Sequence, residues 1–365
     1  SIDPSRYGTT NFPGRDENTY FGKLNVFGAS VGGVIKAGEK LTIAPGLRLE
    51  SFEQFISYDV ININPNDPKF RNAKETFWLP SLNLKYALNE DQNLRFTFSK
   101  TVSVPEFKEV APFVYEGVTQ RVGGNPDLLD NPTFSEVFNI DLKYEWFITR
   151  DELLSVTAFG KQINDPVNRV IASDATGVQR FFRTGDKAEV FGIELEGRKN
   201  LLKNEDDETQ LSVGFNFTYM HTQQDLYESI IGTYSVSFNK SEEELQGASP
   251  IIVNADINYS PTFGNYKPTA NLIFSYFSDR IDALGSGQLG NVIEKGIPTL
   301  DFVLKNKLND KMELNLGIRN ILNPKVQYLR EGTSLGNVLV TSPNGKDVTN
   351  YKRGLGIGLQ FKYNF

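Results

Sequence analysis

The only histidine of the chain, His221, decides whether hydrolytic chemistry is open to this protein. A Ser-His-Asp arrangement needs a base beside its nucleophile, and here that base would have to be His221. The residue has the same parity as Phe217 and Tyr219, which belong to the apolar face of an expected strand. We therefore interpret His221 as a surface residue at the end of that strand, and we expect no catalytic residue and no enzymatic activity.

Two further stretches have compositions that could bind a phosphate or an ion. The glycine run at Val31–Gly33 is followed neither by a helix nor by a Lys-Ser/Thr pair, so we interpret its residues as strand glycines and not as a phosphate loop. The segment Asn62–Phe70, NINPNDPKF, offers the clustered oxygens that calcium prefers. It lacks a regular ligand spacing, which favours ordinary turn chemistry. We expect neither a metal nor a cofactor.

Composition and charge exclude several classes of protein. The 365 residues carry a formal net charge of −7, and no cluster of lysine and arginine suits nucleic acid as a partner. Mean hydropathy is −0.35, and no apolar run approaches the roughly 20 residues of a membrane helix. This does not exclude a membrane β-barrel, because only half of the residues in its strands are apolar. Cysteine is absent, which excludes disulfides and thiolate metal sites.

Apolar and polar residues alternate with a period of two through almost the whole chain. Leu211, Val213 and Phe215, for example, alternate with Ser212 and Gly214, a pattern typical of strands with one polar face. About thirteen strands are predicted, and no stretch predicts a helix. The strands cover Tyr20–Lys36, Leu41–Val60, Phe77–Leu88, Asn93–Ser103, Phe134–Ile148, Glu152–Asp165, Lys187–Leu201, Thr209–Thr222, Pro250–Ser260, Lys267–Ile281, Ile297–Leu308, Met312–Ile321 and Tyr351–Phe365.

The connections between these strands alternate between short and long. AGEK, NEDQ and TRD are short links, whereas Val104–Thr133, Pro166–Asp186 and Gln223–Ser249 are long. A soluble solenoid or propeller would show an internal repeat at a fixed period, and none is present. An antiparallel barrel in an outer membrane has short periplasmic turns and long outer loops. The pattern therefore predicts an all-β fold, a transmembrane antiparallel β-barrel.

The last strand has a large apolar face. Leu355, Ile357, Leu359, Phe361 and Tyr363 alternate with glycine and polar residues, and the chain stops on an aromatic residue, Phe365. In lipid no backbone group can be left unpaired, so such a strand must pair with the first strand of a closed ring. We expect Tyr363 and Phe365 to lie at the periplasmic interface, where aromatic rings anchor barrels.

Several segments together resemble the C-terminal barrel of TonB-dependent outer-membrane receptors of the kind common in Bacteroidota. They are FTFSKTVSVPEFKEVAPF (Phe96–Phe113), GGNPDLLDNPTFSEVFNIDLKYE (Gly123–Glu145), AFGKQINDPV (Ala158–Val167), EVFGIELEGRKNL (Glu189–Leu201), LNLGIRNILNP (Leu314–Pro324) and the terminal strand. The family usually has an arginine where this sequence has Val104 before its proline. The order and spacing of these segments carry the resemblance over nearly the whole chain.

The resemblance implies a barrel of twenty-two strands filled by a plug domain. We interpret residues 1–365 as a partial barrel, about 13 C-terminal strands of a 22-stranded one, and we expect the plug, the first strands and any signal peptide upstream. The implied function is import of a scarce or large nutrient, such as a siderophore, glycan or peptide. Implied partners are the plug, the TonB complex, outer-membrane lipids, the barrel-assembly machinery and a surface lipoprotein. The alternative is a structural, scaffolding or adhesin barrel that is not coupled to TonB.

The resemblance also directs attention to particular side chains. Aromatic and charged residues of two long loops can stack on or pair with a ligand, although such residues also pack loops: Phe113, Tyr115, Glu116, Arg121, Arg180, Phe181, Phe182 and Arg183. By strand parity Glu194, Glu196 and Arg198 face the lumen, where such charges mostly bond to the plug. In this family a C-terminal aromatic belongs to the signal for barrel assembly, a role that Tyr363 and Phe365 would fill.

Overall fold

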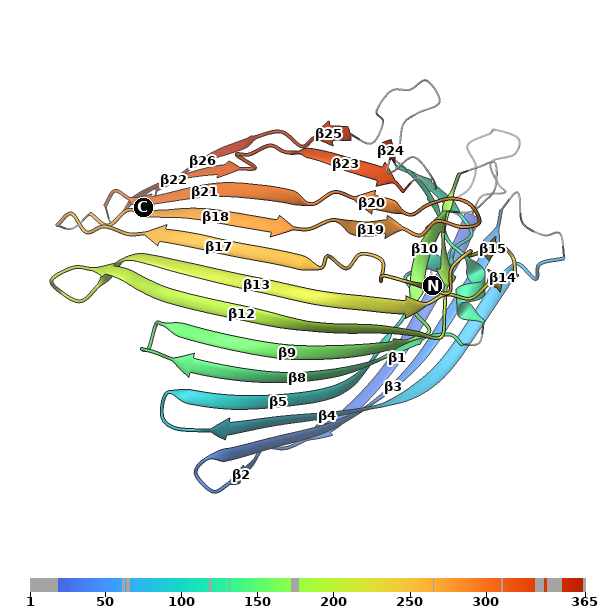
Figure 1. Cartoon of the computed structure of the whole chain (residues 1–365), viewed down its shortest axis with the longest axis horizontal. Coiled ribbons are helices and arrows are strands. Elements are labelled where there is room, and N and C mark those ends of the chain that lie inside the picture. The colour runs from blue at the N-terminus through green and yellow to red at the C-terminus, as the bar shows by residue number, and fades with distance from the viewer. Residues whose placement is uncertain are drawn as a thin grey trace.

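Long β-strands dominate the computed structural model, which describes residues 19–363 except 61–62, 64–65, 118–119, 131, 172–176, 265, 310, 332–337 and 340–349. Figure 1 shows these strands side by side in one curved sheet. Hairpin turns lie at one end of the sheet, and the shorter elements of the long connections lie at the other. No helix in the described part of the chain is long and apolar enough to cross a membrane.

Thirteen long strands form the main sheet, each antiparallel to its neighbours and in the order of the chain. The thirteen predicted strands are thereby confirmed, and β1 and β26 form the two edges of an open wall. Two short strands, β2 (Ile35–Ala37) and β16 (Glu242–Glu243), pair beside this path. The long strands are β1 (Thr19–Gly32), β3 (Leu41–Asp59), β4 (Phe70–Ala87), β5 (Gln92–Ser103), β8 (Ser135–Phe147), β9 (Leu153–Asn164), β12 (Lys187–Lys203), β13 (Thr209–Asp225), β17 (Ile251–Tyr259), β18 (Thr269–Phe277), β21 (Ile297–Lys307), β22 (Met312–Arg319) and β26 (Gly356–Tyr363).

Asparagine side chains fix several of the short turns between these strands. The side-chain oxygen of Asn89 accepts the backbone N–H of Asp91 at 3.0 Å, and that of Asn309 accepts the N–H of Lys311 at 2.9 Å. Such a bond two residues along the chain replaces a backbone turn bond. The short polar links of the sequence therefore form tight hairpins.

The two faces of the main sheet differ in polarity, as the alternation predicts. Residues opposite each other on paired strands share a face. Leu316 lies opposite Leu359, which is 72% exposed, whereas Asn216 lies opposite Asn254 on the other face. The sheet thus has an apolar face and a polar face along its width.

The long connections contain regular structure that the sequence does not predict. We call these connections, at the end of the sheet opposite the hairpins, the cap. A parallel bridge between Val170 and Leu284 links two of its sheets. Its elements are α1 (Phe107–Val110), the 3-10 helix η2 (Pro126–Leu129), the sheet of β6 (Val114–Glu116), β7 (Arg121–Gly123), β10 (Val167–Ile171) and β11 (Gln179–Arg183), the pair β14 (Ser229–Ile230) and β15 (Val236–Ser237), and the sheet of β19 (Arg280–Ala283), β20 (Val292–Glu294), β23 (Lys325–Arg330), β24 (Val338–Leu339) and β25 (Asn350–Lys352).

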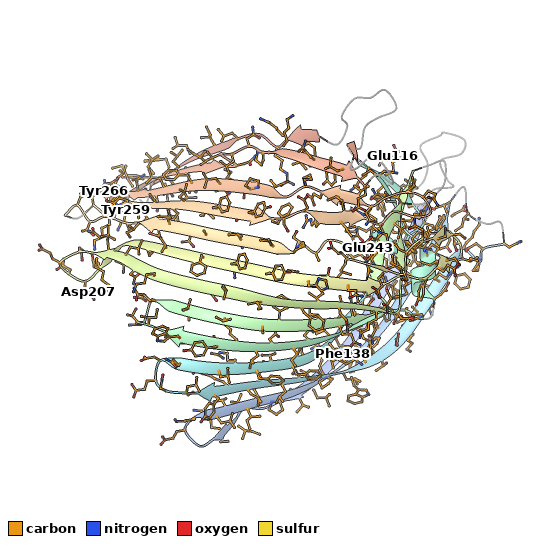
Figure 2. The ribbon with its side chains drawn as sticks, in the orientation of Figure 1. Glu116, Phe138, Asp207, Glu243, Tyr259 and Tyr266 are labelled. Carbon is orange, nitrogen blue, oxygen red and sulfur yellow. The ribbon has the colours of Figure 1, made fainter. Side chains whose placement is uncertain are left out.

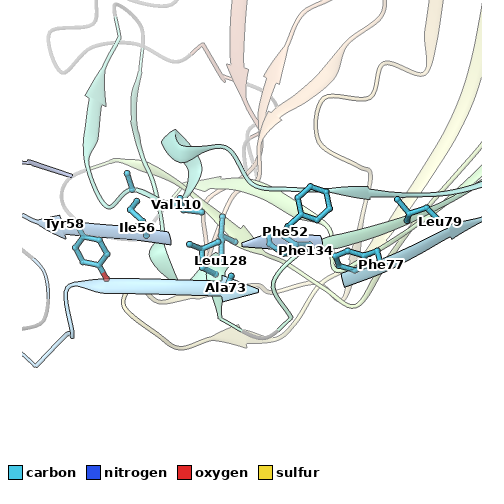
Figure 3. Close-up of a cluster of buried hydrophobic side chains, with 11 residues drawn as sticks. Phe52, Ile56, Tyr58, Ala73, Phe77, Leu79, Val110, Leu128 and Phe134 are labelled. Carbon is cyan, nitrogen blue, oxygen red and sulfur yellow. The ribbon is translucent and has the colours of Figure 1, made fainter. Parts of the chain in front are cut away.

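A hydrophobic cluster attaches the cap to the wall (Figure 3). The rings of Phe52 on β3, Phe77 on β4 and Phe134 before β8 lie 5.7 to 6.2 Å apart between centroids. Val110 of α1 and Leu128 of η2 are buried against them. Burial of each large apolar side chain stabilises the fold by roughly 1.5–3 kcal/mol, so this cluster holds α1 and η2 firmly in place.

Several strand boundaries differ from the prediction. The last strand, β26, begins at Gly356, because Tyr351 pairs with β23 in the cap, and the first strand, β1, ends at Gly32 and not at Lys36. β4 begins at Phe70 and not at Phe77, because its first half pairs with β3 from Ser57↔Phe70 onward. That half does not pair with β5, whose ladder with β4 begins only at Ser81↔Ser99. The predicted strand Lys267–Ile281 ends as β18 at Phe277, since the chain then enters the cap.

Candidate functional site

Four of the predicted ligand residues lie in the cap connection that contains β6 and β7. The rings of Phe113 and Tyr115 meet edge to face with centroids 5.3 Å apart. Glu116 and Arg121, opposite each other on the two strands, form an ion pair at 3.2 Å. The side chains of Tyr115, Glu116 and Arg121 are exposed, and Figure 2 shows Glu116 at the cap end of the molecule.

The other four predicted residues lie on β11, which pairs with β7 at Gln179↔Val122. The two loop segments singled out in the sequence are therefore adjacent. Phe182 is 1% exposed and belongs to an apolar core of the cap. Phe181 points the other way and packs against the cluster of Figure 3. Because its side chain is buried, Phe182 has a packing role and is not exposed to a ligand.

The two arginines of β11 make mainly structural contacts. Arg180 lies over the ring of Tyr234 at 3.7 Å and donates to the carbonyl of Gly124 at 3.2 Å. Arg183 donates to the backbone carbonyls of Leu128, Thr133 and Asp165. Both guanidinium groups thus tie β11 to neighbouring connections.

A cavity of about 360 Å³ lies between the cap and the polar face of the wall. Its polar lining consists of Ser103, Glu109, Ser135, Asn168 and Gln246, and Phe181 is part of its apolar lining. Of the eight predicted loop residues, only Phe181 lines this cavity. A space of this size suits one part of a small ligand, which makes it the candidate site.

Sequence reasoning missed the carboxylate of Glu109, the one acidic group among the described residues that line this cavity. Glu109 Oε2 accepts the backbone N–H of Glu106 at 2.9 Å across the start of α1. The sequence signal was present, since Glu three residues after the N-cap residue, here Glu106, is half of a capping box. Burial raises the pKa of Glu109 above its ordinary value.

The wall residues predicted to face inward do lie on the polar face. Glu194, Glu196 and Arg198 line a second cavity of about 340 Å³ over β12, β13 and β17. Lys143 Nζ lies 3.4 Å from Glu196, and Asn216 donates to Glu194. Their predicted contacts with a plug stay a prediction.

Exposed aromatic side chains mark both ends of the apolar face. Tyr86, Trp146, Tyr259 and Tyr363 lie near the hairpin ends of their strands, as Figure 2 shows for Tyr259. Trp78, Phe191 and Tyr219 lie nearer the cap. An apolar band between two aromatic girdles is the outer surface of a membrane barrel. Phe365 lies outside the described residues, so its predicted role stays a prediction.

The remaining sequence candidates have structural roles. His221 is exposed and lies opposite Phe191 on the apolar face. In NINPNDPKF, Asp67 accepts the N–H of Lys69 at 2.7 Å and pairs with Arg71 at 3.0 Å, which is turn and ion-pair chemistry. No group of three or more metal-ligating side chains occurs within the described ranges.

Comparisons with known proteins agree with this architecture. Residues 1–321 match the family described as "TonB dependent receptor-like, beta-barrel", and no curated protein matches. A point mutant of the ferric enterobactin receptor PfeA from Pseudomonas aeruginosa, in complex with enterobactin, is 14% identical, with a TM-score of 0.57 over 95% of this chain and 55% of that one. The ferric yersiniabactin uptake receptor FyuA from Yersinia pestis is 13% identical, with a TM-score of 0.58 over 95% and 46%.

The ferric citrate transporter FecA in its unliganded form gives a TM-score of 0.61 at 13% identity, again over 95% of this chain and 46% of that one. At such identities the likeness shows a shared fold. The chain spans about half the length of these solved structures.

Proposed function

The chain belongs to the TonB-dependent receptor-like β-barrel family, whose members are integral outer-membrane proteins, and from this premise we propose that it forms wall and cap of a nutrient-import receptor. The family is one of receptors and transporters and implies a plug domain and a TonB partner. The nutrient is scarce or too large for porins, of the siderophore, glycan or peptide class. The chain performs no covalent chemistry in this proposal.

The observation that supports this proposal most directly is the position of the cavity. It lies on the polar face of the wall and directly beneath the cap, with lining from both. A ligand that enters from outside would there contact the cap before it reached the lumen. Solved relatives are named as uptake receptors for ferric yersiniabactin and as a ferric citrate transporter, which supports uptake without identifying this ligand.

The proposal includes further partners. The terminal aromatics Tyr363 and Phe365 would bind the barrel-assembly machinery, and the apolar face would contact outer-membrane lipids. A surface lipoprotein could dock on the exposed β6–β7 hairpin. Each of these contacts is a proposal for the whole protein.

Growth of a deletion strain tests the function. The strain would carry the full-length protein or an empty vector, each with and without TonB, on limiting iron chelates, peptides or glycans. Import predicts that at least one nutrient supports growth only when both the receptor and TonB are present. A scaffold or adhesin predicts that deletion alters adhesion or membrane integrity equally with and without TonB, and that result would reject import.

A further inference from the structure

Among the described residues, the lining of the cavity beneath the cap includes a carboxylate but no basic side chain. Glu109 is its only charged lining residue among those that the structure describes, and Ser103, Ser135, Asn168 and Gln246 supply neutral hydrogen-bonding groups. Asn168 donates to Thr184 and Gln224, and Gln246 accepts the backbone N–H of Arg169. Asn168 and Gln246 are therefore held in place by neighbouring groups, and the electrostatic character of the cavity depends on Glu109.

Two arginines contact residues of the lining, and both are bound to other groups of the protein. Arg169 forms an ion pair with Asp282 at 2.6 Å. Arg183 donates to Ser135 Oγ at 3.3 Å and to the carbonyl groups described above. Neither guanidinium lines the cavity, so neither is placed to receive an anion there.

Three further arginines in or next to the cap are also bound to partners. Arg71 pairs with Asp67, Arg121 with Glu116 and Arg280 with Glu294, at distances from 2.7 to 3.2 Å. An anionic ligand would have to displace one of these carboxylates before it could bind a guanidinium. Such a displacement leaves a carboxylate without its partner and is unfavourable.

Glu109 is in the opposite situation. Its Oε2 accepts one backbone N–H, and no lysine or arginine within the described ranges forms an ion pair with it. Lys108, its neighbour in sequence, pairs with Glu106 at 2.8 Å. Burial raises the pKa of Glu109, which means that its charged form is poorly solvated. A cation placed in the cavity would offset this desolvation.

We propose that this cavity binds a positively charged nitrogen of the imported nutrient, an ammonium or guanidinium group, with Glu109 as its counter-ion. Phe181 lines the same cavity, and aromatic rings attract cations. The nutrient class that this chemistry selects is a peptide with a lysine or arginine side chain. This inference rests on the proposed import function and specifies its ligand.

Calorimetry on the full-length receptor in detergent tests the charge preference. Three end-blocked tripeptides, Gly-Lys-Gly, Gly-Gln-Gly and Gly-Glu-Gly, serve as probes whose central side chain is positive, neutral or negative. A charge-assisted bond contributes about 1.5–3 kcal/mol, so we expect the lysine peptide to bind about 10-fold or more tightly than the glutamine peptide. The glutamate peptide should bind most weakly.

Substitutions in the receptor connect this preference with Glu109. Glu109→Gln retains an acceptor for the Glu106 N–H and removes the charge, so the preference for the lysine peptide should disappear. Glu109→Asp keeps the charge and should retain part of the preference. Glu228→Gln removes an exposed carboxylate of the cap that does not line the cavity, and it should change affinity by less than about 2-fold.

The outcomes separate this inference from the proposed function. Equal affinity for the three peptides, or no binding of the lysine peptide at millimolar concentration, overturns the inference, as would happen if a cation of the plug occupied the cavity. A preference that survives Glu109→Gln also overturns it. TonB-dependent growth on an anionic nutrient, unchanged by Glu109→Gln, would reject only the charge assignment. Growth independent of TonB would reject import itself.

Discussion

The guanidinium of Arg71 lies 3.3 Å from the carboxylate of Asp127 and so joins β4 of the wall to η2 of the cap. Asp127 also accepts the backbone N–H of Thr233 at 2.7 Å, which links η2 to the connection between β14 and β15. Asp67, at 3.0 Å from Arg71, accepts the hydroxyl of Tyr58 at 2.8 Å. Although burial opposes it, hydrogen bonds from Arg71 and Tyr58 lower the pKa of Asp67.

Replacement of Arg71 by Gln should loosen the cap. The substitution leaves Asp67 and Asp127 close together without a cation, and loss of one member of a mostly buried ion pair costs about 3 kcal/mol. Limited proteolysis of outer-membrane vesicles should then cleave the cap faster and spare the wall. Lys69→Gln breaks an exposed pair with Asp59 and should cost under about 1 kcal/mol. Equal cleavage of both variants would contradict the structural role of Arg71.

An arginine at Ile357 should disrupt the lipid-facing surface. Ile357 is 69% exposed on the apolar face of β26, and an arginine at the middle of a membrane barrel costs roughly 2–4 kcal/mol. Gly358→Ser is the control, because a side chain at Gly358 meets no atom within 4 Å and should cost under about 0.5 kcal/mol. Folding titrations of the full-length protein into lipid vesicles give both values. If both substitutions had the same small effect on folding, the assignment of the apolar face to lipid would be wrong.

Replacement of Tyr363 and Phe365 by Ser should reduce the amount of assembled barrel. Tyr363 ends the apolar row of β26 opposite Met312, and a last strand needs an interfacial ring before the barrel closes. The heat-modifiable, membrane-inserted fraction in cells is the measurement. Tyr219 and His221, both exposed on the apolar face, provide the control pair of Ser substitutions. Equal insertion of the two variants would remove the special role of the terminus.

Glu109→Gln should stabilise the cap at neutral pH even though it weakens binding. The pKa of Glu109 is raised in the folded state, so folding favours its protonated form, and this contribution to stability is lost as pH rises through that pKa. The amide stays neutral at every pH. Melting temperatures measured in detergent between about pH 4 and pH 8 should show that the stability of the variant relative to the wild type increases as the pH rises. If Glu109→Gln were less stable than the wild type at neutral pH, the result would indicate that a cationic group stabilises the charged form of Glu109.

The sequence predicted the wall better than the cap for a physical reason. A strand with one lipid-facing side carries a period-two pattern over many residues, as β13 does, and thirteen strands and their faces followed from it. Elements such as β6 and β7 have three residues each, too few to show a period. Their position depends on pairing with β11, far along the chain.

The site was only partly predictable for a related reason. Aromatic and charged composition singled out Phe181 together with Phe182, but only the direction of β11 decides that Phe182 is buried and Phe181 borders the cavity. The sequence around Glu109 indicates that this residue caps a helix, but nothing in it indicates that Glu109 lines a cavity. Cavities formed between distant segments have no local sequence pattern.

The bridge between Val170 and Leu284 constrains how such a receptor can diversify. Backbone bonds run both ways across it, from Ile171 N–H to Leu284 and from Leu284 N–H to Arg169, each at 2.8 Å. If one of these loops were replaced by a loop from a relative, the new loop would lack the neighbouring segment with which it forms backbone hydrogen bonds. New specificities are therefore accessible through point substitutions in the cavity lining, while exchange of a single loop would require its interlocked neighbours to be exchanged with it.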